Sequence, residues 1–427
     1  MDLKSKQISE FKETEIGKIP TEWNIRKLED ILSGKLRHGI YKSKEYLDSK
    51  GVRILKMGLL DESDRIDHQN MERVLVSDSE IERFRICEGS VIFARTSMMT
   101  GGLGNCGIVL KHNDPIIFDG NLLCAEINTQ LADPTYIFYY FKSKYGQNEI
   151  VRITGGTQSR NIAGSQLVNA SVILPSKSEQ IKLSKILFDF DSKIENIKNQ
   201  NIILDQMAQA IFKSWFVDFD GVTEFEDSEL GKIPKEWEVS NIGGKLEVIL
   251  GGTPSRNNGS YWENGNIPWI NSGKTNEFRI ISPSELITEE GLKKSATRLI
   301  PKRTTVLAIT GATLGQVSLL EIDSCANQSV IAIKGNDEIP SEYIYYYVKN
   351  VIKNIISSQT GGAQQHINRQ NVYDANLLVP KKEVIKKYFK ISKPILDIIS
   401  DNCFQIQLLT KTRDILLPKL MSGEIRV

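Results

Sequence analysis

The sequence predicts an α+β protein built from two pseudo-repeated domains of mixed sheet and helices, joined by two long antiparallel coiled-coil helices. Three observations support this class. Sequence blocks recur in the same order in both halves, each half mixes short apolar runs with glycine-rich turns, and each is followed by a segment of helical periodicity. The expected boundaries are 1–176 for the first domain, 177–222 for a central helical spacer, 223–380 for the second domain and 381–427 for a C-terminal helical spacer.

The repeat is clearest where each domain begins. Glu15–Trp23 (EIGKIPTEW) and Glu229–Trp237 (ELGKIPKEW) are identical at seven of nine positions. Three more matches follow in the same order: Tyr136–Lys142 with Tyr343–Lys349, Gly155–Ile162 with Gly361–Ile367, and Val172–Pro175 with Leu377–Pro380. The offset drifts from 214 to 205 residues, which indicates two copies of one domain with small insertions and deletions. Between these blocks the copies diverge, so a shared scaffold is expected to present different surfaces.

Each copy predicts the same order of elements after a turn-rich opening: a buried strand, a glycine-rich hairpin, an aromatic-rich helix, a loop with two glycines and a closing strand. The expected strands are Ser90–Ala94 and Thr305–Ile309, the hairpins Thr100–Gly107 and Thr310–Gly315, the helices Thr135–Tyr145 and Ser341–Ile356, and the closing strands end at Pro175 and Pro380. Trp23 and Trp237 are expected to pack at the start of each domain, and the tyrosines of the two helices to lie partly in the core.

The first spacer predicts a long helix over 181–215 with a coiled-coil seam, because its apolar residues alternate spacings of four and three. The seam consists of Leu183, Leu187, Phe190, Ile194, Ile197, Asn201, Leu204, Ala208, Ile211 and Trp215. Asn201 is its one polar member, and a residue of this kind fixes register at some cost in stability. Two ordinary core helices, one in each domain, remain the alternative.

The second spacer predicts a helix over roughly Lys393–Pro418, with Pro394 near its start and Pro418 and Gly423 at its end. Its apolar rhythm is less regular: Ile395, Ile398, Asn402, Leu409 and Leu416. Because the two helices follow equivalent domains, they are expected to pack antiparallel, with Asn402 opposite Asn201. This packing would place one domain at each end of a rigid spacer.

Composition places few limits on function. A chain of 427 residues with 40% hydrophobic and 25% charged residues is typical of a globular protein of two to three domains. The net charge is only +1, so nucleic-acid binding would have to rest on local patches. The five cysteines have no metal-ligand spacing, which favours free thiols in the cytoplasm. No membrane-length apolar run and no signal peptide are present in the sequence.

Motifs for catalysis are weak or missing. Gly102, Gly104 and Gly107 have the spacing GxGxxG, but the residues that follow predict a strand, whereas a dinucleotide site needs a helix there. The four histidines are dispersed, and neither HExxH nor GxSxG occurs. No metal or catalytic residue is therefore assigned to this chain.

Three signatures together resemble the specificity subunit of type I restriction-modification systems: GKIPxEW opening each half, Ile211–Val222 (IFKSWFVDFDGV), and Asp414–Ile425 (DILLPKLMSGEI). The resemblance covers nearly the whole chain. It implies that each variable half is a target-recognition domain reading half of a bipartite, asymmetric site in double-stranded DNA. It also implies that the helices act as a ruler and dock the partner subunits.

The partners implied by the resemblance are two methylation subunits, which use S-adenosylmethionine to methylate adenine at N6, and two restriction subunits, which need ATP and magnesium. The chain itself would be a non-catalytic recognition subunit without a cofactor. Three other hypotheses stay open: a recognition subunit of a related bifunctional (type IIB-like) system, a coiled-coil adaptor without a DNA role, and a nucleotide-dependent enzyme.

Candidate DNA-binding residues are polar side chains on the equivalent loops of the two copies, because these side chains match base edges and phosphates. In the first domain they are Arg95, Thr96, Ser97, Gln158, Ser159, Arg160 and Asn161. In the second they are Arg256, Asn257, Lys274, Thr310, Thr313, Gln364, Gln365 and His366. Arg160 is the favoured single candidate. For each residue, a solvated loop position or a turn stabiliser is the alternative.

Overall fold

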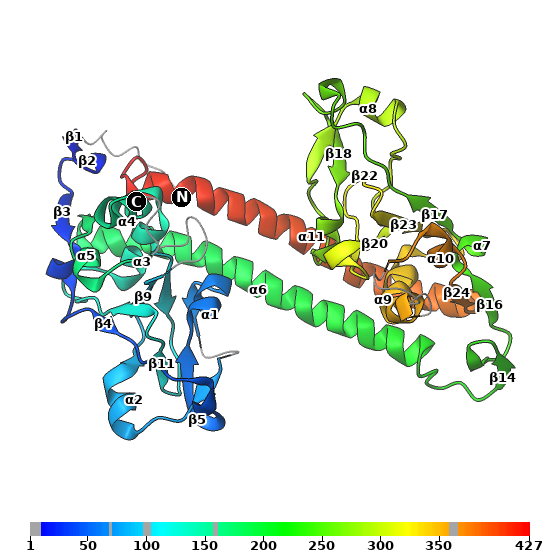
Figure 1. Cartoon of the computed structure of the whole chain (residues 1–427), viewed down its shortest axis with the longest axis horizontal. Coiled ribbons are helices and arrows are strands. Elements are labelled where there is room, and N and C mark those ends of the chain that lie inside the picture. The colour runs from blue at the N-terminus through cyan, green and yellow to red at the C-terminus, as the bar shows by residue number, and fades with distance from the viewer. Residues whose placement is uncertain (1–9, 68–70, 97–103, 157–160, 358–365) are drawn as a thin grey trace. The chain divides into compact units, whose positions relative to one another are not determined.

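The chain divides into two compact units in the computed structural model, which describes residues 10–67, 71–96, 104–156, 161–357 and 366–427 (Figure 1). Unit 1 comprises Met1–Ile194 and Leu409–Val427, and unit 2 comprises Glu195–Leu408. Two helices, α6 (Lys177–Phe216) and α11 (Lys382–Met421), contribute residues to both units. Each sequence repeat therefore forms its own unit together with parts of these two helices.

Unit 1 contains two mixed sheets. The five-stranded sheet has the order β4 (Arg37–His38), β12 (Leu122–Ala125), β9 (Val91–Ala94), β10 (Cys106–Val109) and β6 (Arg65–Ile66). The four-stranded sheet has the order β7 (Arg73–Val74), β5 (Leu47–Leu55), β11 (Ile116–Phe118) and β8 (Arg85–Ile86). The pairs β10–β6 and β11–β5 are parallel, and the other pairs are antiparallel. The short elements η1 (Leu28–Ile31), η2 (Lys44–Tyr46), α1 (Met57–Glu62) and α2 (Asp78–Phe84) connect the strands.

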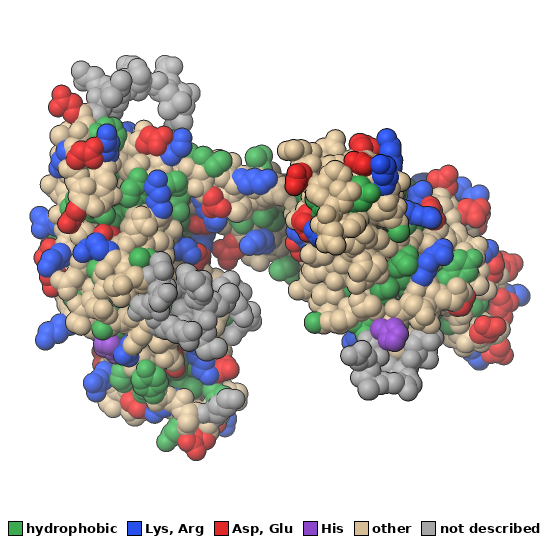
Figure 2. Space-filling model, turned by 45° about the horizontal axis from the view of Figure 1, so that its top comes forward, with side chains coloured by type: hydrophobic (Ala, Val, Ile, Leu, Met, Phe, Trp, Pro, Cys, Tyr) green, Lys and Arg blue, Asp and Glu red, His purple; other side chains and the backbone are tan. Residues whose placement is uncertain are grey.

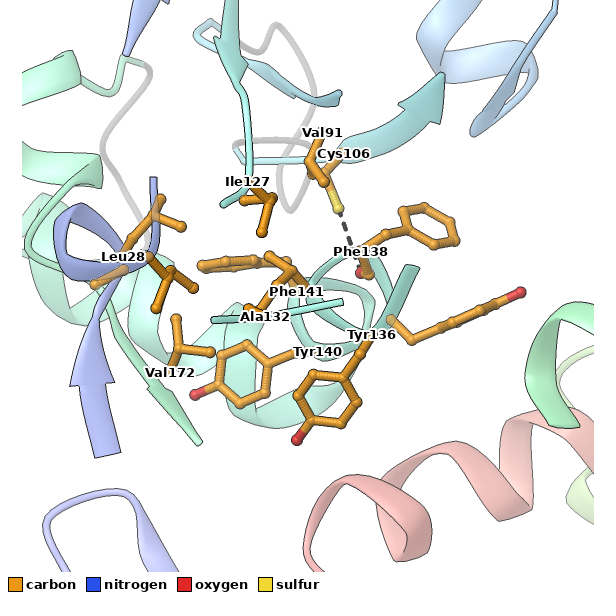
Figure 3. Packing of buried hydrophobic residues seen from close by; sticks show 14 of the residues in the cluster. Leu28, Val91, Cys106, Ile127, Ala132, Tyr136, Phe138, Tyr140, Phe141 and Val172 are labelled. Atoms are coloured by element: carbon orange, nitrogen blue, oxygen red, sulfur yellow. Dashed lines mark hydrogen bonds between the residues drawn. The ribbon is translucent and has the colours of Figure 1, made fainter. Parts of the chain in front are cut away.

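Strand β9 shows how the core of unit 1 is divided. Val91 and Phe93 join a cluster that includes the aromatic helix α3 (Pro134–Lys142), part of which is drawn in Figure 3. Ile92 and Ala94 join a second cluster on the other face. Alternate residues of a strand point to opposite faces, so both faces of this strand are buried. The prediction of a buried strand at Ser90–Ala94 is confirmed, with β9 spanning Val91–Ala94.

The aromatic helix of the first copy is shorter than predicted. The sequence predicts one helix over Thr135–Tyr145, but α3 ends at Lys142 and α4 (Lys144–Thr154) begins two residues later. Ser143 adopts an extended conformation, and its Oγ donates a 2.6 Å hydrogen bond to the carbonyl of Tyr140. A Cβ at Gly146 would lie 2.4 Å from the backbone of Phe141, so this glycine lets α4 turn closely across the end of α3.

Unit 2 repeats this plan with fewer strands. One sheet has the order β17 (Glu247–Leu250), β23 (Val330–Lys334), β20 (Thr305–Ala308) and β21 (Val317–Leu319). The other has the order β19 (Glu285–Ile287), β18 (Ile267–Ile270) and β22 (Cys325–Ala326). Only the β18–β22 pair is parallel. The connecting helices are α7 (Ile242–Lys245), η3 (Gly259–Tyr261), η4 (Ser272–Asn276), α8 (Glu289–Lys293) and η5 (Gly311–Thr313). Strand β20 and the helix α9 (Ser341–Ser357) confirm the predicted elements.

Short strand pairs open and close each copy. The hairpins β1 (Phe11–Thr14)–β2 (Gly17–Pro20) and β14 (Phe225–Ser228)–β15 (Gly231–Pro234) contain the two GKIP blocks. The strands β3 (Asn24–Lys27) and β16 (Glu238–Asn241) pair with the closing strands β13 (Ser171–Leu174) and β24 (Asn376–Val379), which follow α5 (Gly164–Leu167) and α10 (Arg369–Tyr373). Trp23 and Trp237 are both buried at these openings, as predicted.

The two long helices pack antiparallel within each unit. In unit 1, Arg413 of α11 pairs with Asp191 of α6 at 2.5 Å. In unit 2, the Asn402 amide donates to Oδ1 of Asn201 at 2.8 Å, so the expected asparagine pair is present. All ten predicted seam residues of α6 are buried or half-buried. An apolar stripe spaced by four and three therefore faces a partner helix in each unit.

The C-terminal helix differs from its prediction. It begins at Lys382, so Pro394 lies well inside it and not near its start. The predicted end is confirmed, because Pro418 lies in the last turn before Met421 and Gly423, with φ +76°, follows the helix. An interior proline costs about 3 kcal/mol or more, but Tyr388, Leu396 and Ile399 are fully buried on the same helix. Tertiary packing of the apolar face outweighs the local penalty. Ile398 was predicted on that face, but it is 44% exposed.

Two expectations about composition can be compared with the fold. All five cysteines are free thiols, and only Cys87 is exposed. Burial raises the pKa of the Cys106 thiol to about 12 and that of Cys403 to about 11. In the part of the chain that the structure describes, no helix combines the length and apolar character needed to cross a membrane.

Candidate DNA interface

Two of the loops predicted to bind DNA meet in unit 1. The backbone N–H of Arg95, directly after β9, donates to the carbonyl of Asn121 at 2.9 Å, and the carbonyl of Arg95 accepts from the N–H of Ile162 at 2.8 Å. Thr96 and Asn161 form an isolated antiparallel bridge. The structure therefore brings together the described ends of the segments 95–97 and 158–161, which are far apart in sequence.

Unit 2 repeats the two backbone hydrogen bonds of this arrangement. The N–H of Ile309 donates to the carbonyl of Ser329 at 3.0 Å, and the carbonyl of Ile309 accepts from the N–H of Ile367 at 3.1 Å. Thr310 and His366, both predicted candidates, directly adjoin these two anchors; His366 is exposed and Thr310 is half-buried. The two copies thus hold their candidate loops with the same backbone hydrogen bonds.

Two further segments join each meeting point, and sequence reasoning missed both. In unit 1, the N–H of Ile40 donates to the carbonyl of Phe118 at 2.9 Å, next to the turn Asp119–Asn121. In unit 2, the N–H of Gly252 donates to the carbonyl of Ala326 at 2.7 Å, next to the turn Asn327–Ser329. We call each set of four segments a junction. The junction comprises residues 39–41, 95–96, 119–121 and 161–162 in unit 1, and residues 251–253, 309–310, 327–329 and 366–367 in unit 2.

Glycine makes the close approach of these segments possible. A Cβ at Gly39 would lie 2.2 Å from the carbonyl oxygen of Asp119, and one at Gly251 would lie 2.1 Å from that of Asn327. The turns also match, because Asp119 accepts from the N–H of Asn121 as Asn327 does from that of Ser329. An Asp or Asn whose side chain accepts a hydrogen bond from the backbone N–H two residues later is typical of a turn. This signal could have identified both segments in the sequence.

Four further candidates of the second domain are not part of the junction segments, and two of these four are already engaged. Arg256 makes a bidentate pair with Glu285 at 2.6 and 2.8 Å, and its guanidinium lies 3.6 Å from the ring centroid of Trp262. Lys274 donates to Glu277 at 2.6 Å and to Ser282 at 3.1 Å. These contacts give both cations a structural role. Asn257 is exposed, and Thr313 is half-buried in η5.

Six candidates lie outside the described residues: Ser97, Gln158, Ser159, Arg160, Gln364 and Gln365. Gly102 of the GxGxxG spacing lies there too. The residues after Gly104 form strand β10, antiparallel to β9, as the sequence predicts. The helix that a dinucleotide site requires at this point is therefore replaced by a strand.

In each unit an arginine contacts the long helix α6; Arg65 in unit 1 is half-buried and Arg279 in unit 2 is buried. Arg65 lies beside β10, its guanidinium 4.2 Å from the ring centroid of Phe188 on α6, and donates to Ser192 at 3.1 Å. In unit 1 the residue after Arg65, Ile66, pairs in parallel with Val109. In unit 2 the residue after Arg279, Ile280, forms the same kind of parallel bridge with Leu320. The two arginines therefore occupy equivalent positions.

Arg279 lies at the centre of a buried polar network. Its Nη1 donates to the hydroxyl of Tyr345 at 2.8 Å, and the guanidinium faces Asp205 of α6 at 3.5 Å and Glu321 at 3.7 Å. Burial opposes the charge of Arg279, but Tyr345, Tyr346 and these two carboxylates outweigh it and raise its pKa. Burial raises the pKa of Glu321, although Arg303 beside it acts in the opposite direction. Within unit 2, this network links α6 to α9 and to the segments that contain Arg279 and Glu321.

The surface charge is mixed. In the view of Figure 2, Lys and Arg side chains are interspersed with Asp and Glu side chains over both units. This agrees with the net charge of +1 and gives no broad cationic face for unspecific phosphate binding in that view. Within the described ranges, His, Cys, Asp and Glu side chains form no group of three or more that could hold a metal ion.

Comparison with known proteins gives one consistent result. A family model described as the type I restriction modification DNA specificity domain matches the chain twice, at residues 20–205 and 234–412. The chain is 29% identical to the type I restriction enzyme MjaIX specificity subunit of Methanocaldococcus jannaschii, over 98% of this chain and 97% of that protein. It is 25% identical to the HindI specificity subunit of Haemophilus influenzae, over 80% of this chain and 87% of that protein.

The fold has a counterpart among solved structures. The type I restriction-modification S subunit from M. genitalium superposes with a TM-score of 0.62 at 16% identity, and the match covers 93% of this chain and 96% of that one. At this identity the likeness concerns the fold. It agrees with the duplicated α+β units and the two long helices described above.

Proposed function

This chain belongs to the family of type I restriction-modification DNA specificity subunits, and on that premise we propose that each of its domains reads one half of a bipartite, asymmetric DNA site. The observation that carries the proposal is the pair of junctions. Each domain holds four loop segments together, and the backbone hydrogen bonds that do so match between the domains. The side chains on these segments differ between the two domains. A reader of two unlike half-sites needs this combination of a common scaffold and unlike surfaces.

We propose that the chain recognises DNA and leaves the chemistry to its partners. These would be two methylation subunits, which use S-adenosylmethionine to methylate adenine at N6, and two restriction subunits, which need ATP and magnesium. The mixed surface charge supports an obligate complex, because the partners would supply part of the positive charge that phosphates require. We expect this complex to work in the cytoplasm, where the free thiols would stay reduced.

The long helices offer a surface for such partners. Ile202, Ile203 and Met207 of α6 are 50–58% exposed, and Leu408 of α11 is 66% exposed. A cluster of large apolar side chains exposed on a helix is typical of a surface that binds another protein. We propose that the methylation subunits cover these residues of unit 2.

A second candidate, the recognition subunit of a bifunctional restriction-methylation system, would have a similar fold and different partner genes. The relatives are named type I specificity subunits, which favours the first proposal. The adaptor hypothesis predicts no salt-dependent DNA binding even in the assembled complex, and the enzyme hypothesis predicts stabilisation by a dinucleotide.

The test is to co-express the chain with its neighbouring methylation subunit and map N6-methyladenine over the host genome by long-read sequencing. We expect one bipartite motif with a gap of about six base pairs, set by half-sites near one helical turn apart, and its loss when this chain is deleted. A motif that persists without this chain would contradict the proposal. If no methylation is found, DNA binding by the purified complex decides, and its absence would leave the adaptor hypothesis.

A further inference from the structure

The two junctions are held by matching backbone hydrogen bonds and carry different side chains. One of these differences lies at a pair of facing positions. In unit 1 the pair is Tyr41 and Gly120. In unit 2 the equivalent pair is Thr253 and Gln328, because Ile40 and Gly252 make matching hydrogen bonds and so do the turns that contain Gly120 and Gln328. The large side chain comes from the first position in unit 1 and from the second position in unit 2.

In unit 1 the aromatic ring covers the glycine. The hydroxyl of Tyr41 donates to the carbonyl of Gly120 at 3.0 Å, and a Cβ on Gly120 would lie 2.4 Å from the ring. Tyr41 is nevertheless 66% exposed, so most of its side chain is open to solvent. Its hydroxyl is engaged with the backbone, so the ring is held in place and presents its apolar surface.

In unit 2 the amide takes the place of the ring. The hydroxyl of Thr253 donates to Oε1 of Gln328 at 2.5 Å, and Gln328 is exposed. This bond fixes the orientation of a side chain that would otherwise move freely, which lowers the entropy lost when a ligand binds. It uses one lone pair of Oε1, and the amide retains a second lone pair and two N–H donors.

We propose that these paired positions contact bases: Gln328, held by Thr253, reads an adenine in the half-site of the second domain, and Tyr41 contacts a base of the other half-site through its ring. The proposal rests on the proposed function and names residues within it. A glutamine amide matches N6 and N7 of adenine in the major groove, while an apolar ring surface suits the methyl group of thymine. Side chains that differ where the backbone hydrogen bonds match are those able to give two domains two specificities.

The experiment uses the chain assembled with its methylation subunits. The purified complex selects from a DNA library randomised one position at a time across the bipartite site, and the bound DNA is sequenced. The variants are Gln328→Ala, Thr253→Val and Tyr41→Ala. Gln370→Ala is the matched control, since Gln370 is also an exposed glutamine held by a neighbour, Asp374 at 2.8 Å, but lies on α10.

For Gln328→Ala we expect a loss of discrimination of about 5- to 150-fold at one adenine of one half-site, the range of a good bidentate contact. Thr253→Val should give a smaller loss at the same position, because only the orienting bond is removed. Tyr41→Ala should change the other half-site alone, and Gln370→Ala should change neither. In each variant the unaffected half-site reports that the complex is folded and bound.

An unchanged selection pattern with Gln328→Ala and Tyr41→Ala would overturn the inference, and so would uniform weakening at all positions, which indicates phosphate contacts or a scaffold role. Failure of the proposed function is distinguishable, because the wild-type complex would then select no bipartite motif. If a variant yields no complex, thermal unfolding of the full chain shows whether folding was lost. The variant Gln328→Glu is then tested in place of Gln328→Ala. An unchanged preference for adenine with Gln328→Glu overturns the inference.

Discussion

At the scale of single residues, a buried charge network adds to the apolar packing between the second recognition domain and α6. The side chain of Arg279 is completely buried between Asp205 and Glu321, whereas the Arg256–Glu285 pair is about half exposed. Removing one partner of a buried pair leaves the other charge without compensation, and solvent screens an exposed pair. The two arginines therefore should respond very differently to the same substitution.

Arg279→Met is expected to lower the free energy of unfolding of unit 2 by about 3 kcal/mol, because the buried carboxylates Asp205 and Glu321 lose the arginine between them and keep only Lys349 and Arg303. Arg256→Met, the matched control, should cost about 1 kcal/mol. Urea unfolding of the full chain measures both. Equal losses for the two variants would contradict a stabilising role for the buried network.

Residue-scale predictions from the sequence succeeded where one property decides. Trp23 and Trp237 are buried because large apolar surface leaves water in either copy. Arg256 and Lys274 stay predicted DNA contacts, and the structure adds that each is paired with a carboxylate. The Lys274–Glu277 pair is local and readable in the sequence, whereas Glu285 lies 29 residues from Arg256, so only chain folding reveals that pair.

At the scale of elements, the coiled-coil seam was readable because α6 repeats a simple spacing. The start of helix α11 was harder to predict, since Pro394 is a local signal for a helix boundary but lies inside the helix. Local propensity is a weak term beside the burial of Tyr388, Leu396 and Ile399. The antiparallel partner supplies that burial, and its position is not encoded within the segment itself.

The asparagine pair in the seam gives a prediction at this scale. Asn201 and Asn402 share a 2.8 Å hydrogen bond, and Asn201 is 4% exposed. A double-mutant cycle with alanine at both positions should show a coupling of about 0.5–1.5 kcal/mol in urea unfolding, the usual contribution of such a bond. Asn201→Ala combined with Asn257→Ala on an exposed loop should be additive. Additivity in the seam pair as well would mean that the bond does not contribute.

At the scale of the whole molecule, the duplication predicts that the two specificities can be exchanged separately. Replacing residues 223–380 with the equivalent segment of a related subunit should change one half-site of the methylated motif and leave the other. The donor should keep an arginine at position 279 and a tyrosine at position 346, because both contact Asp205 of the retained helix α6. Methylome mapping of the hybrid is the measurement, and a change in both half-sites would refute separate reading.

The sequence by itself determined the duplicated α+β plan, the buried strands β9 and β20, the seam of α6 and the family. These follow from periodicity and from repeated blocks, which are properties of neighbouring residues. Only the tertiary structure decided which loops meet. Residues 39–41 and 119–121 meet Arg95 and Ile162 at one junction. The backbone hydrogen bonds of this junction join segments that lie far apart in the sequence, such as Ile40 with Phe118 and Arg95 with Ile162. Such bonds depend on sheet register and on glycines that permit close approach, and no local pattern specifies the partner segment.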